Sequence, residues 1–125
     1  MADRHTLTLL DILISARLAI NYISEMSWSD FLGNIIVQDA VIRRLEIMGI
    51  ASRNIPKELQ DEISQLPWYE LDQMARTMSE EYAVVNIAFV WDLVHNDLPR
   101  WSQILEVILP DQGFPVPSTI EKDKV

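Results

Sequence analysis

Cysteine is absent from this 125-residue chain, and histidine occurs only twice. Without cysteine the protein has neither a disulfide framework nor a thiolate metal site. His5 and His95 lie far apart in the sequence and have no partner at metal-ligand spacing. We therefore expect neither a metal site nor a cofactor.

Basic residues are also scarce, since 10 Lys and Arg stand against 19 Asp and Glu and give a net charge of −9. This balance excludes broad electrostatic attraction to nucleic acid, which requires clustered Lys and Arg. It favours instead a basic protein partner, or a local basic spot on an otherwise acidic surface.

Long apolar runs are missing, because no stretch reaches the ~18 consecutive apolar residues of a membrane-spanning helix. The segment 7–23 follows Asp3 and Arg4 and has no small-residue cleavage site after it, so this pattern does not indicate a signal peptide. Glycine occurs three times, and no Asn-Gly or Asp-Gly turn separates alternating runs. We expect a single all-α domain in a cytoplasmic protein that makes no membrane contact.

Apolar residues recur at helical spacing along most of the chain. The expected helices cover residues 6–24, 27–32, 35–52, 57–66, 67–82 and 86–108. The first is so apolar that it is either central in its bundle or shared with a second subunit. Ser27 and Asp30 form a capping-box pattern, and Pro56 fits the first turn of the fourth helix. Pro99 interrupts the last helix, and we expect a kink there, with Asp97 as the N-cap of the restart.

Side chains of the helix that opens at residues 67–68 divide into two faces. The expected buried positions are Trp68, Leu71, Met74, Ala75 and Met78, and the expected exposed positions are Glu70, Asp72 and Gln73. The tryptophans at positions 28, 68, 91 and 101 read as core aromatics rather than as a platform for stacking bases. Beyond the helical domain at 1–108, residues 109–125 carry three prolines without periodicity, so we expect an extended or disordered tail.

Charged residues form one row on the helix expected at 35–52. Asp39, Arg43 and Glu46 recur at i, i+4 and i+7, close enough to pair along one face. One interpretation is a solvated ladder of ion pairs. The other is that Arg43 lines a subunit interface or an RNA groove, and the sequence leaves both open.

Four segments, in this order and spacing, carry a family resemblance. Residues 38–46 read Gln-Asp-Ala-Val-Ile-Arg-Arg-Leu-Glu, and 67–68 are Pro-Trp. Residues 74–82 read Met-Ala-Arg-Thr-Met-Ser-Glu-Glu-Tyr, and 90–99 read Val-Trp-Asp-Leu-Val-His-Asn-Asp-Leu-Pro. Together they resemble the HepT family of HEPN-domain toxins over roughly residues 6–108.

The resemblance implies an all-α, up-and-down HEPN bundle of four to five helices that forms a homodimer, with two motif helices facing each other across a cleft. It also implies a metal-independent ribonuclease acting on tRNA or mRNA, as the toxin of a type VII toxin–antitoxin pair. The implied partner is an MntA-like minimal nucleotidyltransferase antitoxin. It silences the toxin by attaching AMP to the motif tyrosine, which adds charge and bulk beside the cleft.

The family motif, Arg-(four to six residues)-His-x-Tyr, is altered in this chain. Its tyrosine falls on Tyr82, its histidine on Glu80 and its arginine on Ala75, with Arg76 directly after. The chemistry needs an acid or base near the ribose 2′-hydroxyl, a task that suits histidine, and a guanidinium to stabilise phosphate charge. A carboxylate serves as the base only with a strongly raised pKa. A shift of one residue turns a helical side chain by about 100°, so the family motif alone does not place Arg76 in the cleft.

Two hypotheses about function follow. In the first, the chain is a ribonuclease toxin whose motif has been changed naturally or by design, with Tyr82 as AMP acceptor or as an interfacial tyrosine. In the second, it is a non-catalytic HEPN binding module that dimerises and holds a nucleotidyltransferase; the acids at Glu80 and Glu81 have the wrong sign for RNA phosphate. An acidic helical bundle with an unrelated role is the third possibility. His95 matches no catalytic position of the family and is expected on the surface.

Overall fold

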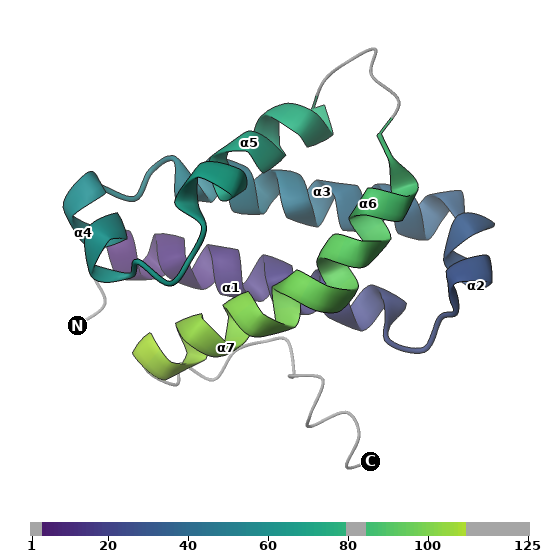
Figure 1. The fold of residues 1–125 in the computed structure, drawn as a ribbon, viewed down its shortest axis with the longest axis horizontal. Helices are drawn as coiled ribbons and strands as arrows, with labels where there is room; N and C mark the ends of the chain where they lie inside the picture. The colour runs from purple at the N-terminus through teal and green to yellow at the C-terminus, as the bar shows by residue number, and fades with distance from the viewer. Residues whose placement is uncertain (1–3, 80–84, 110–125) are drawn as a thin grey trace.

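The computed structural model describes residues 4–79 and 85–109, and all regular secondary structure in these ranges is helical (Figure 1). This confirms the all-α fold class. In chain order the elements are α1 (Arg4–Ile23), α2 (Trp28–Leu32), α3 (Ile35–Ser52), α4 (Lys57–Glu62), α5 (Trp68–Ser79), α6 (Ile87–Asp92), the π-helical turn η1 (Leu93–Asp97) and α7 (Leu98–Ile108).

The helices α1 and α3 lie side by side at the centre of the bundle (Figure 1). α5 packs against α3 and α7 packs against α1, so the four long helices form the body of the domain. The short helices α2 and α6 contact each other and α3 at one end. Because α5 has its main contact with α3, the shape of α3 decides where the motif residues of α5 lie.

Side-chain caps define several helix starts. The Ser27 hydroxyl accepts from the Asp30 N–H at 3.1 Å while the Asp30 carboxylate accepts from the Ser27 N–H at 3.0 Å, which confirms the predicted capping box. Asn34 caps α3 by accepting from the Val37 N–H. Asn86 caps α6 by accepting from the Phe89 N–H.

One apolar core runs through the bundle. Its largest fully buried side chains come from α1, α2, α3, α5, η1 and α7, with Val90 of α6; they include Phe31, Ile12, Leu13, Leu45, Met48, Leu71, Leu98 and Leu105. On α5 the predicted rows hold at Leu71, Met74, Ala75 and Met78, which are buried. Trp68 was expected to be buried, and Asp72 and Gln73 were expected to be exposed. All three are half-buried.

A π-helical turn joins α6 to α7, where the sequence predicted a kinked restart capped by Asp97. The Leu98 N–H donates to the Leu93 carbonyl, five residues back, and Pro99 lies in the first turn of α7. Asp97 is helical and makes no side-chain cap; its carboxylate accepts from Arg100 instead. Asp97 therefore occupies the position before α7 and Pro99 lies in its first turn, as predicted, but Asp97 forms no capping hydrogen bond because the helix continues through it as a π-helical turn.

The fourth helix is shorter than predicted. α4 ends at Glu62 rather than at residue 66, and Pro56 is its N-cap rather than part of its first turn. The Ile63 N–H then closes a turn to Leu59 and Gln60. At the other boundary Leu109 is buried, and the rest of the predicted tail, 110–125, lies outside the described residues.

Of the described residues, only those of α1 form a helix that is long and apolar enough to cross a membrane. The central helix of a soluble bundle meets the same criterion, so this is weak evidence for a membrane span. Here eight α1 residues are buried and the helix packs against α3 and α7. The absence of membrane contact stays a prediction.

Candidate functional site

The crossing of α3 and α5 fixes the position of Ala75. A Cβ placed on Gly49 of α3 would lie 2.4 Å from the Ala75 backbone nitrogen and 2.6 Å from its Cβ. Only a hydrogen at position 49 allows so close an approach of the two backbones. Ala75 is therefore 2% exposed, held in the core face of α5 against α3.

Arg76, the next residue, is exposed rather than buried. It lies on the exposed side of α5, in the last turn of the helix. Tyr69 lies seven residues earlier, about two helical turns, and so shares this exposed face with Arg76. Of the two positions considered for the motif arginine, the structure places 75 in the core and 76 at the surface.

The remaining motif positions, Glu80 and Tyr82, lie outside the described residues. The structure resumes at residue 85, and the capped start of α6 follows. Ser79, the last residue of α5, donates its hydroxyl to the Ala75 carbonyl at 2.5 Å. The motif therefore begins on a well-defined helix end and continues directly into the segment that joins α5 to α6.

Arg43 lies on the outward face of α3. Its guanidinium donates to the Glu46 carboxylate at 3.0 Å, which confirms one pair of the predicted ladder. Ile36 and Ile50 lie seven residues before and after Arg43, on the same side of the helix. Ile36 is 81% exposed and Ile50 is also exposed. This outward stripe of α3 combines exposed apolar side chains with a cation.

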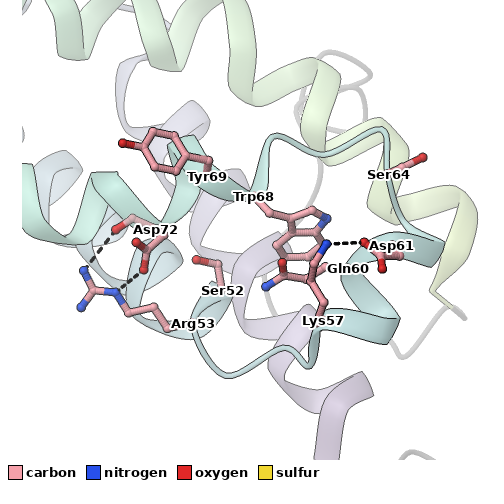
Figure 2. Close-up of a pocket in the computed structure, with 9 residues that line it drawn as sticks. All are labelled: Ser52, Arg53, Lys57, Gln60, Asp61, Ser64, Trp68, Tyr69 and Asp72. Atoms are coloured by element: carbon pink, nitrogen blue, oxygen red, sulfur yellow. Dashed lines mark hydrogen bonds and ion pairs between the residues drawn. The ribbon is translucent and has the colours of Figure 1, made fainter.

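A pocket of about 610 Å³ lies where the end of α3, the helix α4 and the start of α5 meet (Figure 2). We call it the α3–α5 pocket; it is lined by Ser52, Arg53, Lys57, Gln60, Asp61, Ser64, Trp68, Tyr69 and Asp72. Arg53 donates to the Asp72 carboxylate at 2.5 Å and to its backbone carbonyl at 3.2 Å. Lys57 donates to Asp61 at 2.7 Å. The sequence did not predict this pocket, because its residues come from three separate helices.

The tryptophans divide between core and rim. Trp101 is buried, as predicted, and Trp68 is half-buried with its indole N–H donating to the Ile63 carbonyl. Trp28 and Trp91 belong to an aromatic cluster between α2 and α6, where Trp91 stacks on His95 with ring centroids 5.1 Å apart. His95 itself is exposed, as expected.

A second pocket, of about 560 Å³, lies between the start of α1, α4 and the end of α7. Its rim carries Glu58 and Glu62, and His5 has a buried Nδ1 atom without a hydrogen-bond partner. Within residues 4–79 and 85–109, no group of three or more His, Asp or Glu is arranged to hold a metal ion.

These helices, with a motif that starts at the end of α5, define a helical bundle of the HEPN type. The chain belongs to the HepT-like ribonuclease family: the family model described as "Ribonuclease HepT-like" matches residues 12–108. It therefore carries a ribonuclease-type HEPN domain, as the resemblance implied.

Individual relatives agree with this assignment. The "Probable ribonuclease HepT" of Thermococcus cleftensis is 34% identical over 99 residues, covering 79% of this chain and 90% of that protein. "Putative RNase MJ0127" of Methanocaldococcus jannaschii is 31% identical over 103 residues, covering 82% and 85%.

A third relative is longer than this chain. The "Gamma-glutamylcyclotransferase and putative RNase MJ0434" of M. jannaschii is 34% identical over 98 residues, which cover 78% of this chain and 44% of that protein. The chain thus spans less than half the length of that relative. No solved structure gives a significant match.

Proposed function

We propose that this protein is the toxin of a type VII toxin–antitoxin pair, a cytoplasmic, metal-independent ribonuclease that acts on tRNA or mRNA. The observation that carries the proposal is Arg76, an exposed arginine in the last turn of α5, four residues before Glu80, where the other motif positions begin. Membership of a ribonuclease family supports the same activity.

The proposed reaction is an attack within the RNA strand. The ribose 2′-oxygen bonds to the adjacent phosphorus, its proton passes to a base, and the bond to the 5′-oxygen breaks. The products are a 2′,3′-cyclic phosphate and a 5′-hydroxyl, with no metal or other reactant consumed. Arg76 supplies the charge that stabilises the phosphate oxygens in the transition state. Glu80, at the position of the family histidine, is the candidate base, and Tyr82 follows it two residues later in the sequence.

The proposed assembly is a homodimer that uses the outward stripe of α3. Exposed isoleucines at 36 and 50 flank Arg43, and Leu32 and Ile35 extend the apolar surface toward α2. Single exposed apolar residues are ordinary, but four of them on α2 and α3, around a surface arginine, favour an interface. In this proposal Arg43 takes the interfacial role that the sequence left open.

The proposed antitoxin is an MntA-like minimal nucleotidyltransferase that transfers AMP to the Tyr82 hydroxyl. The phenol oxygen would bond to the α-phosphorus of ATP and displace pyrophosphate. The added phosphate would repel RNA at the site. Incubation with such an enzyme and ATP should increase the mass of the protein by one AMP group, and Tyr82→Phe should prevent the increase.

Cleavage of total tRNA in the presence of EDTA tests the central proposal. The unmodified protein should cut, and Arg76→Ala should lower the rate about 100-fold or more, as expected for loss of a transition-state contact. Arg100→Ala is the matched control, because Arg100 is also an exposed arginine in a helix but lies on α7. Equal rates for all three proteins would remove Arg76 from the mechanism.

A second candidate function, a non-catalytic module that dimerises and binds a nucleotidyltransferase, is favoured by one observation. A glutamate stands at position 80, where the family has its histidine. Glu80→His separates the two candidates. A rate increase of about 100-fold supports a ribonuclease scaffold whose base has been weakened. No cleavage by either protein, with nucleotidyltransferase binding retained, supports the binding module.

A further inference from the structure

The α3–α5 pocket brings together side chains that the proposed reaction does not use. A volume of about 610 Å³ falls within the range of small-molecule sites and is ample for one nucleotide. Its walls supply aromatic rings, cations and amide or hydroxyl groups. Figure 2 shows Arg53 beside Asp72 at one side of the pocket, and Lys57, Gln60 and Trp68 together at the other.

We propose that this pocket binds one nucleotide of the RNA strand, a few positions from the bond that is cut. The base packs on the exposed ring of Tyr69, and the phosphate is held by Lys57 and Arg53. The inference rests on the proposed ribonuclease function and deepens it, because such a subsite selects which RNA strands are cut.

The two aromatic side chains of the pocket differ in exposure and in how they are held. The Trp68 indole is held in place by its hydrogen bond to the Ile63 carbonyl at 2.9 Å, so its orientation is fixed before a ligand arrives. Tyr69 is 73% exposed, at the start of the same helix. Figure 2 shows the two side chains pointing in different directions, so the exposed Tyr69 ring is the one that offers a free face for stacking, which tolerates any base.

The cations are available to a phosphate. Lys57 and Asp61 pair across one helical turn and both are largely exposed, so the pair contributes little to stability and can open. Arg53 is held more firmly, by two contacts with Asp72, and forms a fixed wall. With two cations and two carboxylates the pocket has no formal net charge, on a chain whose net charge is −9.

The pocket at the start of α1 provides a useful comparison. It is almost as large, but its rim carries Glu58 and Glu62 and no lysine or arginine. A phosphate would be repelled there. Of these two pockets, the α3–α5 pocket is therefore the one whose charges admit a nucleotide.

Its position fits a strand that also reaches Arg76. Tyr69 and Arg76 are seven residues apart on one exposed face of α5, which corresponds to about 10 Å along the helix axis. A strand of a few nucleotides can span this distance. The pocket would then hold a base while the neighbouring phosphates approach the end of α5.

Binding of a fluorescein-labelled octamer of 2′-O-methyl RNA, followed by anisotropy, tests the inference. The methyl group blocks the attacking oxygen, so binding is measured without cleavage. We expect Tyr69→Ala to raise the Kd about fivefold to tenfold through lost stacking, and Lys57→Glu about tenfold or more through charge reversal. The matched controls are Tyr22→Ala and Arg100→Glu, which change exposed residues elsewhere and should stay within about twofold.

The outcomes separate this inference from the proposed function. If the variants follow the expected order but the protein does not cut tRNA, the nucleotide pocket stands and the ribonuclease proposal fails. If the protein does not bind the octamer, or Tyr69→Ala and Lys57→Glu bind it as tightly as the unmodified protein, the pocket inference is wrong. Loss of nucleotidyltransferase binding in these variants, with octamer binding unchanged, would assign the pocket to a protein partner and overturn it too.

Discussion

At the scale of single residues, the contact between Gly49 and Ala75 controls the site. A methyl group at position 49 would meet the backbone of α5, which cannot move aside as a flexible side chain can. We expect Gly49→Ala to lower the free energy of unfolding by about 1–3 kcal/mol from overpacking, partly offset by the better helix propensity of alanine. Urea denaturation measures the change.

Gly33→Ala is the matched control for this prediction. A Cβ at Gly33 would lie 3.6 Å from the nearest oxygen, an ordinary contact, and the residue has a negative φ of −93°. Its unfolding free energy should change by less than about 0.5 kcal/mol. If both variants were equally stable, the close approach of α3 and α5 would not be what positions α5.

Position 75 gives a second prediction at this scale, because restoring the arginine of the family motif there should unfold the protein. The Ala75 side chain is packed against α3, so an arginine would bury a charge without a partner or force the helices apart. We expect Ala75→Arg to lose about 3 kcal/mol or more, measured by urea denaturation. Thr77→Arg, at an exposed position of the same helix, should be almost neutral. A stable Ala75→Arg protein would reopen position 75 as a site for the motif arginine.

The same residue shows how far the sequence could predict the site. Apolar periodicity assigned Ala75 to the buried row, while the motif comparison assigned it to the family arginine, and the sequence alone could not weigh one against the other. The deciding fact is the Gly49 contact, which joins residues from two helices. Glycine 49 carries no signal in the sequence that identifies its neighbour.

At the scale of helices, the cap at Asn86 holds the element that follows the motif segment. Its side-chain oxygen accepts from the Phe89 N–H at 3.0 Å, which leaves one fewer unsatisfied donor at the start of α6. We expect Asn86→Ala to lower the free energy of unfolding by about 1 kcal/mol in urea denaturation. Asn96→Ala, an exposed asparagine within η1, should cause no loss. An equal loss in both variants would point to a general effect of removing asparagine.

Helix positions were predictable where the signal is local. The cap at Ser27 was predicted from its neighbouring residues, and α3 was placed at its observed bounds. The π-helical turn could not be predicted, because the proline in the sequence indicates only that one backbone hydrogen bond is lost. Whether a new helix starts with a cap at this point, or the helix continues through a wider π-helical turn, depends on how α7 packs against α1. The end of α4 was predicted wrongly for the same reason, because the turn at Ile63 buries that side chain in the core.

At the scale of the whole molecule, the features missed by sequence reasoning are those built from several helices. The α3–α5 pocket depends on three elements, and Tyr69 drew no notice because an exposed tyrosine has no periodic signature. Net charge, by contrast, was informative in advance. An acidic chain can bind RNA only where its few cations collect, and Arg53, Lys57 and Arg76 are three of the ten basic residues in the sequence.

The proposed homodimer gives the last prediction. Ile36 is 81% exposed and begins the outward stripe of α3, where a second copy would cover it. We expect light scattering coupled to size-exclusion chromatography to show a dimer for the unmodified protein and a monomer for Ile36→Glu, because the interface would bury an unpaired carboxylate. Val107→Glu is the matched control, since Val107 is 87% exposed but lies on α7. If Val107→Glu dissociates the dimer and Ile36→Glu does not, the interface lies on α7, and Arg43 returns to the solvated ion pair with Glu46.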